Sequence, residues 1–370
     1  MKYLNLESVA NYFEISKLYI EVIVAFGLSF ILTFVAIPKI IRVSYRKHLM
    51  DVPGSRSSHS TKVPRLGGVA LFFAISIVAS VFSSELLYQV LFLSAAIILL
   101  FFIGLMDDLL VVAPHKKLYA QILSATLIVV GSDIRIGNFV GLFGFYEIPY
   151  LLSVLISIFI IVLIINSYNL IDGIDGLASG VGGLISLCFV FIFFRLYDYT
   201  TGFLAIAVLA ALLAFSYYNL SKEYKIFMGD TGSMVIGLLI AFMVIKFINL
   251  SGLDWVMIKN APVVSIAILI VPLIDTLSVI IIRLWSRKSP FFPDQNHIHH
   301  RLLRLGFNHL QTTVIICFSN ISIIVFAYFI RHLNINLMFI LVVFASLFLS
   351  YLPLVLGEKI NHKNRINNLN

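Results

Sequence analysis

Residues 150–180 read YLLSVLISIFIIVLIINSYNLIDGIDGLASG, and this one stretch shows how the whole chain is built. Its first part, 150–167, is a continuous apolar run of the length that crosses a bilayer as a helix. Its second part is rich in Asn, Asp and Gly and begins where the apolar run ends. The same succession recurs along a chain that is 60% hydrophobic and 12% charged, with a mean hydropathy of +1.02. The composition therefore predicts an all-α integral membrane protein.

Ten or eleven runs of this kind lie along the chain, and run 118–131 is the weakest of them. Because the runs are continuously apolar and do not alternate with polar residues, they predict helices and exclude the strands of a transmembrane barrel. We predict a single polytopic membrane domain over residues 1–370, with spans near 17–41, 66–83, 86–105, 118–131, 150–167, 180–197, 203–219, 231–250, 262–283, 312–330 and 335–356.

The Lys and Arg residues between the runs predict the orientation. If the N-terminus lies outside, the inner segments hold three times as many of these residues as the outer segments, and cytoplasmic loops carry such an excess. We therefore predict an outside N-terminus and a cytoplasmic C-terminus. Contact between the basic loops and anionic membrane lipids then accounts for most of the net charge of +8, so nucleic acid is not expected as a partner.

Acidic residues are scarce, with only 18 among 370 positions. Six of them lie in polar breaks between the apolar runs, all on the predicted cytoplasmic side, which indicates chemistry or ion binding rather than solvation alone. They are Asp107, Asp108, Asp172, Asp175, Asp230 and Asp294. The cytoplasmic segments expected to form a site lie near 42–65, 106–117, 168–179, 220–230 and 284–311.

The motif NSYNLIDGIDGLASG at 166–180 is the most specific of these segments. Asn166, Asn169, Asp172 and Asp175 recur at every third position, so neighbouring members share one face of a helix that the glycines loosen. A polar face at the end of a span predicts a substrate or ion site. A polar seam between helices is the alternative.

Asp107 and Asp108 adjoin one another, and Lys116 and Lys117 follow them. Adjacent residues on a helix point about 100° apart, so the two carboxylates serve two different partners. Paired carboxylates opposite a lysine suit a divalent cation that itself holds a diphosphate.

Two further loops carry groups that bind phosphate or metal. The segment DVPGSRSSHSTKVPRLGG at 51–68 offers backbone amides, hydroxyls, Arg56 and Arg65, which bind phosphate well; a basic loop on the membrane surface is the alternative. The segment FMGDTGSM at 227–234 places Asp230 at the opening of a span. There it is either a helix cap or a metal ligand beside a phosphate.

The longest cytoplasmic loop contains SPFFPDQNHIHHRLLRLG at 289–306. Pro293 or Asp294 is expected to start a short helix that Gly306 ends. Three closely spaced histidines do not close a tetrahedral zinc site without a further ligand. Imidazolium and guanidinium groups aimed at phosphate oxygens fit better, and the candidates are His297, His299, His300 and Arg301.

Asp275 is the one carboxylate inside a predicted span, in VPLIDTLSV. Ionisable groups there are costly and are paired or functional. A structural, hydrogen-bonded role and a functional role both stay open.

Together these segments resemble the polyprenyl-phosphate N-acetylhexosamine-1-phosphate transferase superfamily, also called glycosyltransferase family 4. The resemblance rests on DVPGSRSSHSTKVPRLGG, GLMDD with KLYAQ, NSYNLIDGIDGLASG, FMGDTGSMVIG, PLIDT and SPFFPDQNHIHHRLL, in family order. It implies an enzyme that moves a sugar-1-phosphate from a UDP-sugar to undecaprenyl phosphate and releases UMP, with Mg²⁺ or Mn²⁺ as cofactor. It further implies a bacterial cytoplasmic membrane location with the active site on the cytoplasmic side. A homodimer is left open.

The resemblance also implies roles for individual residues. Asp230 matches the metal ligand of the family, Asp108 is a second candidate ligand, and the KLxxQ match selects Lys117 over Lys116. The aspartates Asp107, Asp108, Asp172 and Asp175 match catalytic positions. The expected substrate-binding residues are Asn166, Asn169, Arg56, Arg65, Arg301 and the three histidines.

His297-Ile298-His299-His300 resembles the branch that starts O-antigen, capsule, common-antigen or teichoic acid chains with an N-acetylated sugar. The phospho-MurNAc-pentapeptide transferase branch, which carries three consecutive histidines, is the alternative. From another class, a cation-coupled transporter fits the intramembrane Asp275. For the transferase, either the lipid phosphate attacks directly with Asp107 as its base, or an aspartate forms a covalent phosphosugar intermediate; the direct attack is preferred.

Overall fold

The computed structural model describes residues 6–51, 62–83, 87–251, 260–285, 287 and 297–367. Most of these residues are helical, and the strands form two small antiparallel pairs. The elements are α1 (Leu6–Arg46), β1 (Met50–Asp51), β2 (Val63–Pro64), α2 (Gly67–Phe82), α3 (Leu87–Leu110), α4 (Pro114–Thr126), a π-helix (Leu127–Gly131), β3 (Asn138–Leu142), β4 (Phe145–Glu147), α5 (Tyr150–Ile171), α6 (Leu177–Arg195), α7 (Tyr199–Asn219), α8 (Gly229–Ser251), α9 (Ala261–Ile268), α10 (Ile270–Trp285), α11 (Ile298–Arg304), α12 (His309–Phe329) and α13 (Ile335–Asn367).

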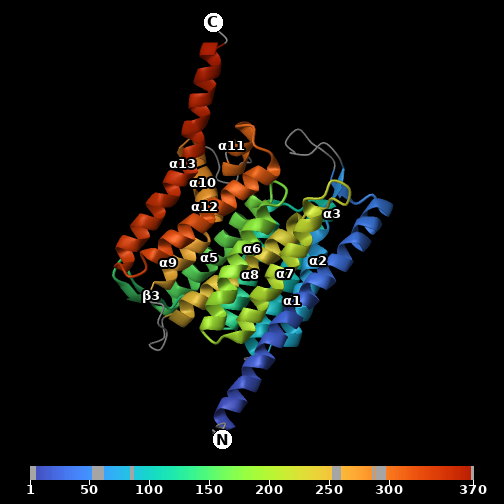
Figure 1. Ribbon diagram of the computed structural model, residues 1–370, viewed down its shortest axis with the longest axis vertical. Coiled ribbons are helices and arrows are strands. Elements are labelled where there is room, and N and C mark those ends of the chain that lie inside the picture. The colour runs from blue at the N-terminus through green and yellow to red at the C-terminus, as the bar shows by residue number, and fades with distance from the viewer. Residues whose placement is uncertain are drawn as a thin grey trace, which may run out of the picture.

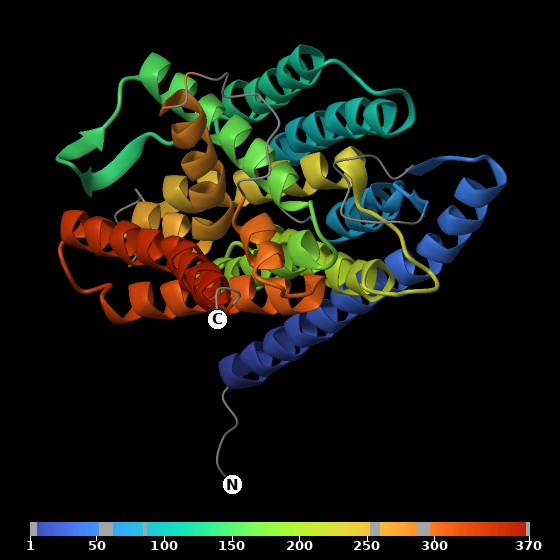
Figure 2. The same ribbon diagram turned by 90° about the horizontal axis from the view of Figure 1, so that it is seen from above.

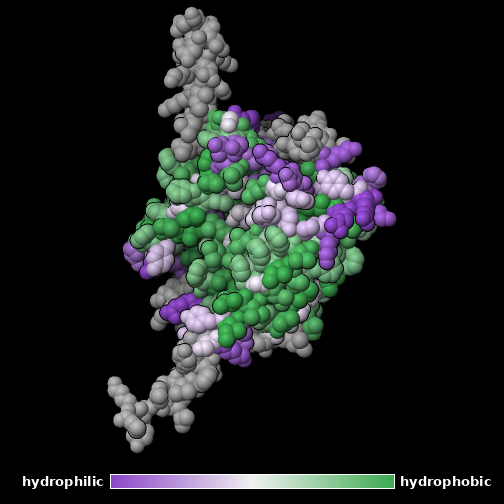
Figure 3. Space-filling view, turned by 45° about the vertical axis from the view of Figure 1, so that its right-hand side comes forward, coloured by the Kyte–Doolittle hydropathy of each residue, from purple (hydrophilic) through white to green (hydrophobic). Residues whose placement is uncertain are grey.

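The helices pack into one bundle, and the two chain ends lie at its opposite ends (Figure 1). The short helix α11 lies at the same end as the C-terminus (Figure 1). From above, α3 and α4 lie across the bundle from α12 and α13 (Figure 2). In the space-filling view, hydrophobic residues cover the middle of the visible face and hydrophilic residues gather toward both ends (Figure 3). This is the surface expected of helices that contact lipid tails along their middle parts.

Among the described residues, seven helices are long and apolar enough to cross a membrane, and the α9–α10 pair, bent by 77°, makes eight. The predicted spans 66–83 and 335–356 correspond to shorter apolar helices, Gly67–Phe82 and Ile335–Tyr351. Run 118–131 forms the end of α4 and the π-helix that follows. An all-α membrane protein is thus confirmed, whereas the count of eleven spans is not, and the orientation stays a prediction.

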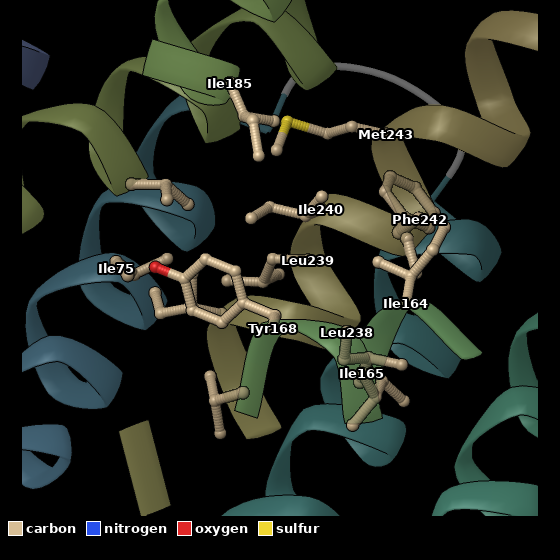
Figure 4. Close-up of a cluster of buried hydrophobic side chains, with 14 of the residues drawn as sticks. Ile75, Ile164, Ile165, Tyr168, Ile185, Leu238, Leu239, Ile240, Phe242 and Met243 are labelled. Atoms are coloured by element: carbon tan, nitrogen blue, oxygen red, sulfur yellow. The ribbon is translucent and has the colours of Figure 1, made fainter. Parts of the chain in front are cut away.

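Helix α8 lies at the centre of the bundle, where α2, α3 and α5 pack against it. Its apolar residues are buried on every side, which is typical of a helix that is hydrophobic all round. Figure 4 shows Leu239 and Ile240 of α8 among Ile75, Ile164 and Ile185 from the surrounding helices. This central position fixes where the first turn of α8, which carries the GDTGS motif, must lie.

Two glycines let the backbones of neighbouring helices approach the start of α8. A Cβ added at Gly104 of α3 would lie 2.6 Å from the Cα of Thr231, and a Cβ at Gly68 of α2 would lie 2.5 Å from the Cα of Gly232. Small residues at such crossings are how membrane helices pack closely. The close approach brings the end of α3, with its aspartate pair, against the start of α8.

A partly buried ion pair lies at the other end of the bundle. Helix α6 starts at the motif-bearing end and runs away from it, so Asp198, which follows α6, lies at the far end. Asp198 accepts a hydrogen bond from the backbone N–H of Thr201 (3.1 Å) at the start of α7 and pairs with Lys246 of α8 (2.8 Å). Its partners are those of a structural cap, and it serves below as a reference for substitutions.

Candidate active site

Asp108 holds the first turn of α8. Its carboxylate accepts hydrogen bonds from the backbone N–H groups of Asp230 (2.9 Å) and Thr231 (3.0 Å) and from the Thr231 hydroxyl (2.5 Å). The first N–H groups of a helix have no partner inside it, and the helix dipole favours a negative charge there. Asp230 was predicted either to cap this helix or to bind metal. The cap comes instead from Asp108 on α3, which leaves the Asp230 carboxylate for other partners.

Lys117 joins two of the predicted carboxylates. Its Nζ atom lies 2.7 Å from Asp107 Oδ2 and 2.5 Å from Asp230 Oδ2. Burial acts to lower the pKa of Lys117, but the charges of Asp230 and Asp107 outweigh it and hold the pKa above its ordinary value. The lysine is therefore charged at neutral pH. Of the two adjacent lysines, the structure brings Lys117 to the aspartates, as the KLxxQ match predicts.

The polar face of α5 meets α8 and α4. The Asn169 side-chain amide donates to Asp230 Oδ1 (3.2 Å) and to the Ser233 hydroxyl (2.7 Å). Asn166 exchanges hydrogen bonds with Gln121 of α4, at 2.7 and 3.3 Å. Asn169 thus orients the Asp230 carboxylate, while Asn166 supports the neighbouring helix. Gln121 belongs to the KLYAQ motif, but no role was assigned to it from the sequence.

Asp172 follows α5 directly and brings a further carboxyl group to the site. Burial, together with the charges of Asp230, Asp108 and Asp175, raises its pKa well above the usual range. Within the described part of the chain, no hydrogen-bond donor reaches its carboxylate. The ionised form of Asp172 therefore has no compensating partner among the described residues.

Asp175 forms a separate ion-pair cluster. Its Oδ2 lies 2.6 Å from Lys225 Nζ and 2.8 Å from His309 Nδ1, and its backbone carbonyl accepts from the Thr313 hydroxyl (3.1 Å). Burial alone would raise the pKa of Asp175, but the hydrogen bonds from His309 and Lys225 outweigh it and lower the pKa. Asp175 thus ties the turn after α5 to α12. Lys225 and His309 were not predicted, because no sequence spacing links them to Asp175.

Asn219 fixes the same turn from the end of α7. Its side chain accepts from the backbone N–H of Gly176 (2.6 Å) and donates to the carbonyl of Ile226 (2.9 Å). Gly176 has a φ of +80°, a conformation that favours glycine. One buried amide therefore links the IDGIDG turn to the loop before α8, and the sequence gave no signal for it.

The histidine segment lies between α10 and the IDGIDG turn. The Nδ1 atom of His297 lies 2.9 Å from Asp275 Oδ2, and a Cβ added at Gly173 would lie 2.7 Å from His299 Nε2. Burial lowers the pKa of His299 to about 3. This imidazole is therefore neutral near neutral pH in the absence of a bound phosphate, and the expected contact with phosphate oxygens stays a prediction.

The first loop reaches the site through its backbone. Phe227 N–H donates to the carbonyl of Pro64 (2.8 Å), and Gly67 and Gly68 N–H donate to the carbonyls of Phe227 (3.0 Å) and Met228 (2.8 Å). Arg65, between these residues, is thereby held beside the start of α8.

Some predicted residues fall elsewhere. Arg56 and Asp294 lie outside the described residues. The expected helix of the histidine loop is present, but it begins at Ile298, with His297 as its N-cap, and ends at Arg304. Arg301 and His300 lie on this helix, half-buried.

A divalent cation fits the chemistry of the site, although its ligands are not yet arranged around it. In the part of the chain that is described, no group of three or more His, Cys, Asp or Glu residues is placed to hold a metal ion. The oxygen donors are nevertheless those that Mg²⁺ prefers. Burial, followed by the nearby charges of Asp230, Asp108 and Asp175, raises the pKa of Asp172, so a bound cation would stabilise its ionised form. Asp172 and Asp230 are the carboxylates best placed to take a cation, since both Asp108 oxygens hold the α8 backbone.

The fold and the site define a polytopic membrane protein with a carboxylate–lysine network where three helices end. Residues 90–248 match the sequence profile of glycosyl transferase family 4. This match supports the superfamily that the motifs resemble.

Named relatives cover most of the chain. A Bacillus subtilis (strain 168) protein, the probable undecaprenyl-phosphate N-acetylglucosaminyl 1-phosphate transferase, is 29% identical over 89% of this chain and 91% of its own length. The undecaprenyl-phosphate alpha-N-acetylglucosaminyl 1-phosphate transferase of Escherichia coli (strain K12) is 28% identical over 74% of each chain. A Yersinia pestis protein of the same name is 28% identical over 80% of each chain.

Proposed function

We propose that the protein transfers an N-acetylhexosamine-1-phosphate from a UDP-sugar to undecaprenyl phosphate. The observation that carries the proposal is the network of Asp107, Asp108, Lys117 and Asp230 at the start of α8. The named relatives, which cover most of the chain, support the acceptor and the general reaction. The Ile298 that separates His297 from the last two histidines supports an initiating enzyme of a cell-surface glycan. We place the site on the cytoplasmic side of the bacterial inner membrane, from the Lys and Arg distribution.

The reaction follows from the charges. An oxygen of the lipid phosphate bonds to the sugar-bearing phosphorus of the donor, the bond from that phosphorus to the bridging oxygen breaks, and UMP leaves with the electron pair. Both partners are anionic, so the barrier lies in bringing them together and in stabilising the charge on the leaving phosphate. Lys117 holds Asp107 and Asp230 in place, and Asp107 takes the remaining proton of the lipid phosphate. A bound Mg²⁺ or Mn²⁺, held by Asp172 and Asp230, would neutralise diphosphate charge.

The transporter alternative fits the structure less well. A transporter binds its substrate near the middle of the membrane, between related halves. Here the polar network lies at helix ends: Asp108 in the last turn of α3, Asp172 directly after α5 and Asp230 in the first turn of α8.

The test is UMP release by the purified protein from UDP-GlcNAc, UDP-GalNAc and 6-deoxy analogues, with undecaprenyl phosphate and Mg²⁺. Release with one donor and dependence on the lipid support the proposal and identify the sugar. Absence of release with every donor would contradict it. A sugar-phosphate adduct on the protein in the absence of lipid would replace direct attack with the covalent route.

Removal of divalent cations is expected to abolish UMP release, and Mg²⁺ or Mn²⁺ to restore it, because the carboxylate charge otherwise repels the diphosphate. The measurement is activity after EDTA treatment and metal titration, with Mn²⁺ binding followed by electron paramagnetic resonance. Full activity after complete chelation would exclude the metal.

Lys117→Met is expected to lower kcat/KM by about 10²–10³-fold, the range for loss of one positioned charge-stabilising group. The substitution leaves Asp107 and Asp230 facing each other without a cation. Lys116→Met is the matched control, because the neighbouring Lys116 is exposed. Equal losses of kcat/KM in the two variants would show that the contacts of Lys117 with Asp107 and Asp230 are not needed for activity.

A further inference from the structure

Asp275 is a buried carboxylate in an apolar helix, with only 2% of its surface exposed. It lies in the second turn of α10, after the bend that separates α9 from α10. A charge in such a place is costly unless it is paired and hydrogen-bonded. The partners of this carboxylate therefore indicate its role.

The described partners of its carboxylate belong to the histidine segment. Asp275 Oδ1 accepts a hydrogen bond from the backbone N–H of Ile298 (2.6 Å), the first residue of α11. Asp275 Oδ2 lies 2.9 Å from His297 Nδ1 and 3.9 Å from His299 Nδ1. One carboxylate thus caps α11 and binds the ring of the residue before it.

The opposite side of this segment faces the active site. The rings of His297 and His299 stack with centroids 5.5 Å apart and planes at 11°. His299 turns Nδ1 toward Asp275 and Nε2 toward Gly173, the residue after Asp172. The histidines are therefore clamped between α10 and the turn that carries Asp172.

We infer that Asp275 is a positioning residue, which seats the N-terminus of α11 and accepts the Nδ1–H of His297, so that the imidazolium form of that ring donates its Nε2–H to a phosphate oxygen of the donor. The inference rests on the proposed transfer reaction. A histidine that works at one ring nitrogen is commonly oriented by a carboxylate at the other. Asp275 does not itself touch the substrate and acts through His297.

The test is a double-mutant cycle of Asp275→Asn and His297→Gln, with kcat and KM measured for both substrates by UMP release. Asp275→Asn is expected to lower kcat/KM for the nucleotide sugar on the order of 10–100-fold, with KM for the lipid unchanged. In the His297→Gln background, the same substitution is expected to cost less than about 3-fold, because the ring that it orients is gone. Losses that multiply in the double variant would overturn the inference.

Two controls separate positioning from folding. Asp198→Asn changes a partly buried aspartate, paired with Lys246, at the far end of the bundle, and it is expected to lower thermal stability in detergent without a change in kcat/KM. If Asp275→Asn does not fold, Asp275→Glu replaces it in the cycle, with the same non-additivity expected. A wild-type protein inactive with every donor would refute the proposed function, whereas an active wild type with multiplicative losses would refute only the role of Asp275.

Discussion

Asp230→Asn is expected to abolish measurable sugar-phosphate transfer, with a loss in kcat of at least about 10²–10³-fold. The carboxylate is shared between Lys117 (2.5 Å) and the Asn169 amide (3.2 Å), and its side chain stays 25% exposed toward the site. The substitution keeps the shape but removes the charge that pairs with the lysine and attracts a divalent cation. The measurement is UMP release at saturating donor and lipid, with Mn²⁺ affinity followed by electron paramagnetic resonance.

The control for this prediction is Asp198→Asn, which removes the charge of a partly buried aspartate far from the site. We expect Asp198→Asn to retain transfer and Mn²⁺ binding while its melting temperature falls. If Asp230→Asn retained full metal-dependent activity, Asp230 would not be a ligand. If both variants lost activity equally, the loss would reflect folding.

The helical character of the chain was predictable, because continuous apolar runs fold only one way in a membrane. The number of spans was not. Run 262–283 is interrupted at Leu269, and the two helices on either side meet at 77°. Pro272 lies two residues after the start of α10. Proline has no backbone N–H and therefore cannot donate a hydrogen bond to the preceding turn. The proline in VPLID therefore indicates the bend, but a hydropathy profile alone does not show it.

Most of the candidate site was predictable as well, because its residues lie in motifs with short, regular spacing. Asp108 lies against the first turn of α8, which carries Asp230, and Lys117 bridges Asp107 and Asp230. The partners contributed by distant segments were missed, since Lys225 and His309 reach Asp175 only after folding. No sequence spacing encodes contacts of that kind.

The contacts of Asp108 could not be predicted from its residue type and motif alone. It was predicted as a catalytic residue and metal ligand, but both of its oxygens hold the first turn of α8. In the proposed reaction, Asp108 contributes to catalysis by holding Asp230 in place.

Gly229→Ala is expected to lower transfer activity by about 10²-fold or more, since a displacement of about 1 Å at a catalytic group has that effect. Gly229 has a φ of +71°, and a Cβ there would lie 2.5 and 2.7 Å from the two oxygens of Asp108. It would also meet the carbonyl of Arg65. A single methyl group therefore pushes Asp108 away from the amides that it caps and shifts Asp230 relative to Lys117.

Gly144→Ala separates this effect from backbone strain. Gly144 has a similar φ of +81°, but a Cβ there meets nothing within 4 Å. Both variants carry the cost of a left-handed alanine, about 1–2 kcal/mol, and only Gly229→Ala displaces a carboxylate. We expect Gly144→Ala to keep wild-type kcat/KM in the UMP assay. The two glycines differ in their surroundings and not in their backbone conformation. An active Gly229→Ala enzyme would therefore show that the hydrogen bonds of Asp108 to the first turn of α8 are not needed to position Asp230 for catalysis.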